Sequence, residues 1–67
     1  MTLIVHLAEC RKAAGLTQAQ LAEAAGVSRK TINTIENRVF VPSTRLALVM
    51  ARVLGVSVHD LFELPPP

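Results

Sequence analysis

The amino-acid sequence predicts one small all-α domain built from five short helices. Three observations lead to this fold class. Serine and threonine, preferred residues at helix starts, precede apolar runs at Thr17, Ser28, Ser43 and Ser57. Glycines follow several of these runs, where a left-handed residue closes a helix. The connections are short, as in helical bundles, and the 67 residues contain no internal linker, so we expect a single domain over residues 1–67.

The first two helices have clear boundaries in the sequence. The first is expected over 6–14, with Gly15 in the left-handed position after it. Thr17 begins the second helix, and Gln20, three residues later, completes a capping box. This second helix ends at Gly26.

The third helix follows after an unusually sharp turn. Only Gly26, Val27 and the cap Ser28 separate it from the second helix. Two helices joined this closely cross steeply, as in a helix-turn-helix, and Gly26 tolerates the positive φ that the corner requires. The motif is expected over about residues 17–37.

The helical period assigns the two faces of the third helix. At about 100° per residue, Ile32 and Ile35 face the core together with Glu36. The opposite face is polar and without acid. It carries Lys30, Thr34 and Asn37, with Thr31 and Asn33 on its flanks.

The remaining helices are expected over 44–54 and 58–62. Pro42 ends the segment after the third helix, and Gly55 closes the fourth. Within the fourth helix a stripe of apolar residues is expected in the core, and Leu48 lies off that stripe. The stripe consists of Leu46, Val49, Met50 and Val53. The three prolines at 65–67 are expected to form an extended, mobile tail.

Composition limits the classes of function. A single cysteine, Cys10, excludes an intramolecular disulfide and is interpreted as a small buried apolar residue. His6 and His59 lie far apart in the sequence, so no metal site is expected, and neither a catalytic triad nor a phosphate-binding glycine loop is present. We therefore expect no enzyme, no cofactor and no small-molecule ligand.

The apolar content predicts a subunit interface. Hydrophobic residues make up 51% of the chain, yet no run approaches the about 20 residues of a membrane span. The N-terminal region lacks the features of a signal peptide, so a cytoplasmic protein without membrane contact is expected. The surplus apolar surface favours a homodimer, with Leu48, Phe62 and Leu64 as the candidate interface residues.

Positive charge is concentrated in one segment. Residues 28–45 carry four bases and one acid, +4 − 1 = +3, against +2 for the whole chain. The bases are Arg29, Lys30, Arg38 and Arg45. Small charge clusters are often simply solvated, but two bases in the first turn of a helix are unfavourable to its dipole. Their presence indicates a polyanionic partner.

The stretch "LTQAQLAEAAGVSRKTINTIENR" resembles the helix-turn-helix of the phage-repressor and Cro family, also called the xenobiotic-response-element type. The downstream "VPSTRLALVMARVLGVSVHDLFE" is similar to its short members, so the resemblance covers about residues 7–62. It implies a lambda-repressor-like fold and binding of double-stranded DNA, with the third helix in the major groove. The apolar "TLIV" resembles the small dimeric cytolysin-operon repressors, which implies a short strand pair between the two ends of the chain.

The resemblance also implies roles for individual residues. Gln18 matches a glutamine that contacts phosphate and braces the reading helix. Arg11 and Glu36 match an ion pair between the first and third helices. Base-reading positions correspond to Arg29, Lys30 and Thr34, and backbone-contacting positions to Asn37 and Arg38. The other candidates on the DNA-facing side are Ser28, Thr31 and Asn33.

One position departs from the family pattern. Many relatives have glycine where this chain has Arg38. Asn37 or Arg38 must then adopt the left-handed conformation that ends the helix, and asparagine tolerates it better.

Two functional hypotheses remain from the sequence. The first is a homodimeric transcription regulator, in particular a repressor, that recognises an inverted-repeat operator. The second is a protein-binding helix-turn-helix module, for example an antitoxin whose helical surface blocks a toxin. A segment able to wrap a toxin would distinguish them, and this sequence contains almost none.

Overall fold

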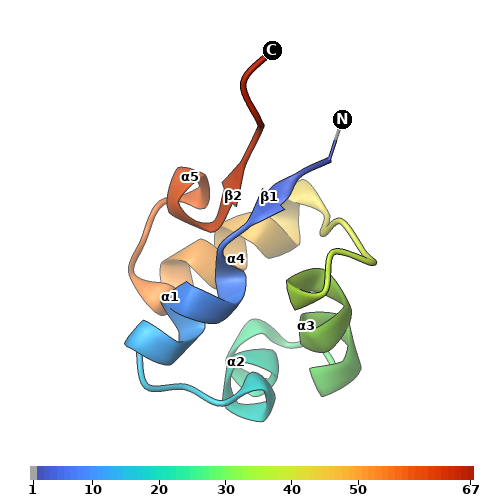
Figure 1. The fold of residues 1–67 in the computed structure, drawn as a ribbon. Helices are drawn as coiled ribbons and strands as arrows, with labels where there is room; N and C mark the ends of the chain where they lie inside the picture. The colour runs from blue at the N-terminus through green and yellow to red at the C-terminus, as the bar shows by residue number, and fades with distance from the viewer. Residues whose placement is uncertain (1) are drawn as a thin grey trace.

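The computed structural model describes residues 2–67, and the predicted helices are all present (Figure 1). The elements, in chain order, are β1 (Ile4–Val5), α1 (Leu7–Ala13), α2 (Gln18–Ala25), α3 (Arg29–Glu36), α4 (Thr44–Leu54), α5 (Val58–Leu61) and β2 (Phe62–Glu63). The all-α expectation is confirmed, together with the short strand pair that the resemblance implied. None of the helices among the described residues combines the length and the apolar character that a membrane span requires.

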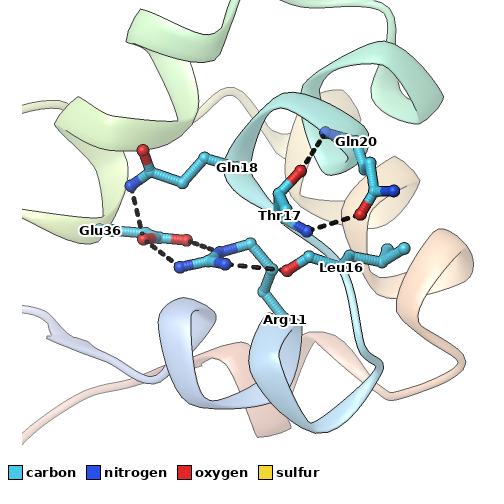
Figure 2. A network of polar contacts seen from close by, with 6 residues as sticks. All are labelled: Arg11, Leu16, Thr17, Gln18, Gln20 and Glu36. Atoms are coloured by element: carbon cyan, nitrogen blue, oxygen red, sulfur yellow. Dashed lines mark hydrogen bonds and ion pairs between the residues drawn. The ribbon is translucent and has the colours of Figure 1, made fainter.

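The caps predicted for α2 and α3 form as expected. The N–H of Gln20 donates to Thr17 Oγ1 at 3.1 Å, and the Thr17 N–H donates to the Gln20 side chain at 2.8 Å (Figure 2). Ser28 Oγ accepts from the N–H of Thr31 at 3.1 Å. Gly26 adopts φ +74° at the corner between α2 and α3. These local bonds satisfy N–H groups that a helix start otherwise leaves without partners.

The core lies where α1, α2, α3, α4 and α5 meet. Its largest fully buried side chains are Leu7, Leu21, Ile32, Ile35, Met50 and Leu61. Ile32 and Ile35 therefore occupy the inward face of α3, as the period predicted. Every helix contributes at least one of these side chains, so the position of α3 depends on the whole bundle.

The predicted core stripe of α4 needs one correction. Met50 is fully buried, and Leu46 and Val53 pack on the core from half-buried positions. Val49 does not pack on the core and instead borders a surface hollow beside Leu48. The small residues Ala47 and Ala51 occupy the buried positions instead, which rotates the buried face away from Val49. Sequence pattern favoured the larger apolar side chain, but close helix packing favours alanine.

The strand pair joins the two ends of the chain. β1 and β2 are antiparallel, with Ile4 opposite Glu63 and Val5 opposite Phe62. Phe62 was expected to end the last helix, but it begins β2. In Figure 1, β1, β2 and the chain end that follows β2 lie at the top, on the opposite side of the molecule from α2 and the lower end of α3. His6 lies between β1 and α1. Its Nε2 is 3.0 Å from Glu63 Oε1, and its Nδ1 is 3.2 Å from Glu9 Oε2.

Candidate nucleic-acid interface

The sharp turn between α2 and α3 leaves one side of α3 open to solvent. Beyond Gly26, the Val27 N–H donates to the Ala22 carbonyl at 3.0 Å, which fixes the corner. Ala22 is buried, and its small side chain allows the two helices to approach closely. As a result α3 lies close to α2 (Figure 1), with Ile32 and Ile35 buried and with Arg29, Lys30 and Asn33 exposed.

The exposed side of α3 brings together most of the predicted DNA-facing residues. Arg29, Lys30 and Asn33 are exposed and border one surface hollow. Thr31 and Thr34 are only half-buried, so they lie at the edge of this side rather than at its centre. The Thr34 hydroxyl donates to the Thr31 carbonyl at 2.9 Å. That bond uses the only hydrogen the hydroxyl has, so Thr34 can accept but cannot donate to a base.

The left-handed residue at the end of α3 is Arg38 rather than Asn37. Asn37 is the C-cap with φ −88°, and Arg38 adopts the left-handed conformation with φ +61°. Of the two residues that could take this conformation, Arg38 does so, although asparagine tolerates it better. The reason is the hydrogen-bond pattern, in which the Arg38 N–H donates to Ile35 and the Val39 N–H to Thr34. Such a helix ending requires the left-handed residue directly after the C-cap.

An exposed apolar loop follows Arg38. Val39, Phe40 and Val41 are 78%, 48% and 68% exposed. Sequence reasoning did not include these residues in the candidate site. The available signal was an apolar run between a basic residue and Pro42, in a connection that is normally polar.

The exposed cations of the segment 28–45 have no carboxylate partner within ion-pair distance among the described residues. They are Arg29, Lys30, Arg38 and Arg45, all of which are exposed. The acid of this segment, Glu36, is turned inward and paired with Arg11 of α1. The outward positive charge of the segment is therefore not offset by its own acid, which favours an anionic partner.

Glu36 is part of a polar brace that we define as Arg11, Gln18 and Glu36 (Figure 2). Arg11 donates from Nε to Glu36 Oε2 at 2.6 Å and from Nη2 to Oε1 at 3.2 Å. Gln18 Nε2 donates to the same Oε1 at 2.9 Å, and Arg11 Nη1 donates to the Leu16 carbonyl at 2.9 Å. The brace thus connects α1, the loop before α2, α2 itself and α3. The pairing of Arg11 with Glu36, and the contact of Gln18 with α3, are as the resemblance implied.

Burial makes this brace energetically demanding. The side chains of Arg11 and Glu36 are only 10% and 7% exposed. Burial raises the pKa of Glu36, but hydrogen bonds from Arg11 and Gln18 outweigh it and hold the pKa below its ordinary value. No buried side-chain nitrogen or oxygen in the described part of the chain lacks a hydrogen-bond partner. The carboxylate therefore remains ionised near neutral pH and fixes α3 relative to α1.

A second exposed surface is apolar and is formed by residues outside α3. An apolar groove of ≈ 290 Å³ runs between Leu3, Val41, Leu48 and Phe62. Leu48 is 57% exposed, and Leu64, farther along the chain, is 67% exposed. Phe62 is half-buried because one side of its ring packs on the core. The residues expected at a dimer interface thus border neighbouring hollows, both lined by Phe62.

Comparison with known proteins agrees with this geometry. The sequence profile of the Helix-turn-helix family matches residues 7–61. An uncharacterised HTH-type transcriptional regulator of Archaeoglobus fulgidus is 43% identical over 57 residues, which cover 85% of this chain and 81% of the relative. A similar regulator of Methanothermobacter thermautotrophicus is 47% identical over 57 residues, covering 84% and 83%.

Solved structures show the same fold. The N-terminal DNA-binding domain of SinR, the master biofilm regulator of Bacillus subtilis, has a TM-score of 0.72 and 35% identity, covering 84% of this chain and 83% of that domain. The clp gene regulator ClgR from Corynebacterium glutamicum has a TM-score of 0.77 and 33% identity, covering 81% of this chain. This chain spans only 57% of the ClgR chain. The chain belongs to the helix-turn-helix family of the phage-repressor and Cro type, and it is a transcriptional regulator with a helix-turn-helix DNA-binding domain rather than an enzyme.

Proposed function

We propose that the protein is a homodimeric repressor that binds an inverted-repeat operator in double-stranded DNA. The observation that carries this proposal is the exposed side of α3. Within residues 2–67 its bases have no carboxylate partner, while the acid of the same helix is buried against Arg11. A polar, basic helix surface of this kind suits the major groove, where phosphates flank hydrogen-bonding base edges.

The two ends of α3 take different roles in this proposal. Lys30 and Thr34 read base edges, with Arg29, Thr31 and Asn33 around them, because they lie along the part of α3 that enters the groove. Lysine reaches the acceptor edge of guanine, whereas Thr34 can only accept or make an apolar contact. Asn37 and Arg38 lie where the chain leaves the helix, and there they contact phosphate.

Gln18 and Ser28 position the motif on the DNA backbone. One N–H of the Gln18 amide is used by Glu36, which leaves the second N–H for a phosphate oxygen. Ser28 begins α3, so the free N–H groups of the first turn lie beside it, and such a helix start favours a phosphate. Because the brace connects α2 to α3, contact of α2 with the DNA backbone also determines the angle at which α3 lies in the groove.

Dimerisation explains the apolar surface that the monomer leaves exposed. We assign the interface to Leu48, Phe62 and Leu64, because they are apolar, border neighbouring hollows and do not belong to α3. A twofold dimer places two α3 helices on half-sites about one turn of DNA, roughly 34 Å, apart. In this proposal the dimer represses by occupying the promoter.

The proposal is tested by selecting binding sites from a random duplex library with the full chain. We expect enrichment of an inverted repeat and a dimer in light scattering at micromolar concentration. A matched single half-site should bind much more weakly than the full site. A monomer that binds half-sites as well as full sites would contradict the dimeric operator, and selection without any enriched sequence would contradict base reading.

A further inference from the structure

A separate hollow of ≈ 370 Å³ lies between α3 and the loop that follows it. It is lined by Ser28, Lys30, Thr31, Thr34, Val39 and Phe40. Lys30 also borders the exposed hollow with Arg29 and Asn33, so the two hollows adjoin on the reading side of α3. The roles assigned above use the polar groups of this side and leave Val39 and Phe40 without a function.

The loop is held firmly against α3. Arg38, with φ +61°, reverses the chain direction after the helix. The N–H groups of Val39 and Phe40 then both donate to the Thr34 carbonyl, at 2.9 and 3.2 Å. The apolar wall of the hollow is therefore built into the helix ending, and its position relative to Thr34 is fixed by backbone bonds.

The chemistry of the hollow favours an apolar group. Val39 is 78% exposed and Phe40 48% exposed, so contact with a ligand would remove apolar surface from water. Thr34 adds no free donor, because its hydroxyl hydrogen is bound to the Thr31 carbonyl. Against the side chains of Val39 and Phe40 a phosphate oxygen would lose water and gain no hydrogen bond, so this wall does not suit the DNA backbone.

We infer that this hollow receives the C5-methyl group of a thymine in the major groove, with Phe40 and Val39 as specificity-determining residues. The thymine methyl is the one apolar group that the four bases present in the major groove, and phenylalanine and the threonine methyl are suitable partners for it. Lys30, on the rim of the hollow, then contacts a neighbouring base. The inference rests on the proposed function, since it requires α3 to lie in the major groove.

The test removes only the methyl group from the DNA. Each thymine of a selected operator is replaced in turn by deoxyuridine, which keeps every hydrogen-bonding group of the base. At one thymine in each half-site, the wild-type protein should lose about fourfold in affinity, and about 15-fold when both half-sites are changed, as expected for one buried methyl group per half-site.

Variants assign the effect to the hollow. Phe40→Ala and Val39→Ala should bind the thymine and deoxyuridine operators with nearly equal affinity, because the wall that contacts the methyl group is reduced. Val41→Ala is the matched control, since Val41 is also exposed in this loop but borders the groove beside Leu48. Its ratio of affinities for the two operators should equal that of the wild type. Circular dichroism of the variants verifies that each remains folded.

The outcomes separate the inference from the proposed function. If the protein selects an operator but no thymine is sensitive to loss of its methyl group, the inference is wrong and DNA reading by α3 stands. The same holds if Phe40→Ala and Val39→Ala keep the wild-type ratio. If no operator is enriched at all, the proposed function fails and the inference fails with it.

Discussion

Arg11 of α1 donates from Nε to Oε2 of Glu36 on α3 at 2.6 Å, in a region where both side chains are largely excluded from water. This contact spans 25 residues of sequence and connects the first helix to the reading helix. A buried charge without its partner is costly, so the pair strongly favours one arrangement of α3. The orientation of α3, which we propose reads DNA, thus depends on a side chain outside the helix-turn-helix itself.

Removal of one partner should destabilise the domain strongly. Glu36→Ala leaves the Arg11 guanidinium buried beside an apolar side chain, and we expect a loss of about 3–5 kcal/mol in the free energy of unfolding. Urea denaturation followed by circular dichroism measures this loss. Glu23→Ala, which removes an exposed acid on α2, is the control and should stay within about 0.5 kcal/mol of the wild type. A loss for Glu36→Ala as small as that of the control would show that the pair is solvated and contributes little.

The histidine at the strand pair should make stability depend on pH. Hydrogen bonds to Glu63 and then to Glu9 raise the pKa of His6 above its ordinary value of 6.5. A raised pKa in the folded state means that protonation stabilises the fold. This contribution is fully present below pH 6.5, and it is lost as the pH rises through the folded-state pKa. The midpoint of thermal unfolding should therefore fall over this range above pH 6.5.

Two histidine variants isolate this effect. His6→Gln should remove the fall of the thermal midpoint above pH 6.5. His59→Gln, at an exposed position on α5, should retain it. A wild-type midpoint that stays constant or rises across this pH range would contradict the role of His6.

The left-handed residue after α3 should cost stability. Arg38 holds φ +61°, a conformation that costs an L residue about 1–2 kcal/mol. Glycine releases this strain but adds about 0.5–1 kcal/mol of backbone entropy to be lost on folding. The net expectation for Arg38→Gly is a gain of up to about 1 kcal/mol, or a few degrees in Tm for a domain of this size. Calorimetry that finds a lower Tm would show that the arginine side chain stabilises this corner.

Charged substitutions at the proposed dimer interface should weaken dimerisation without changing α3. Leu48→Asp and Leu64→Asp each place a carboxylate on an exposed apolar position, so the monomer should fold while the dimer weakens. Sedimentation velocity at several concentrations should show a shift toward monomer for both variants. Ala24→Asp, exposed on α2, is the control and should remain as dimeric as the wild type. If both leucine variants remain as dimeric as the wild type, the interface does not include Leu48 and Leu64.

The helix boundaries were predictable because short-range chemistry determines them. Thr17 and Ser28 cap α2 and α3 through bonds to residues three positions away, which sequence spacing reveals. The faces of α3 followed from its period, since Ile32 and Ile35 are fully buried. In contrast, Val49 was predicted in the core from its size and the helical period. The structure buries Ala47 and Ala51 of α4 instead, because neighbouring helices approach α4 closely there, and the sequence does not show how close that approach is.

Parts of the candidate site depend on three-dimensional contacts that no local pattern contains. The contact of His6 with Glu63 requires the two ends of the chain to pair. The hollow beside Phe40 exists because two backbone N–H groups share the Thr34 carbonyl, a detail of how α3 ends. The pairing of Arg11 with Glu36 came only from the family resemblance, because helical period places Glu36 inward but does not name its partner.

The central claim is that α3 reads bases near its start and contacts phosphate at its end. Lys30→Ala and Arg38→Ala, measured on a panel of single-base operator variants over a range of salt concentrations, test it most directly. We expect Lys30→Ala to relax preference at one base pair per half-site, by about 1–3 kcal/mol. Arg38→Ala should weaken all operators alike and flatten the slope of log K against log salt by about one unit for each phosphate that the variant no longer neutralises. A changed base preference for Arg38→Ala together with an unchanged preference for Lys30→Ala would contradict this division of roles.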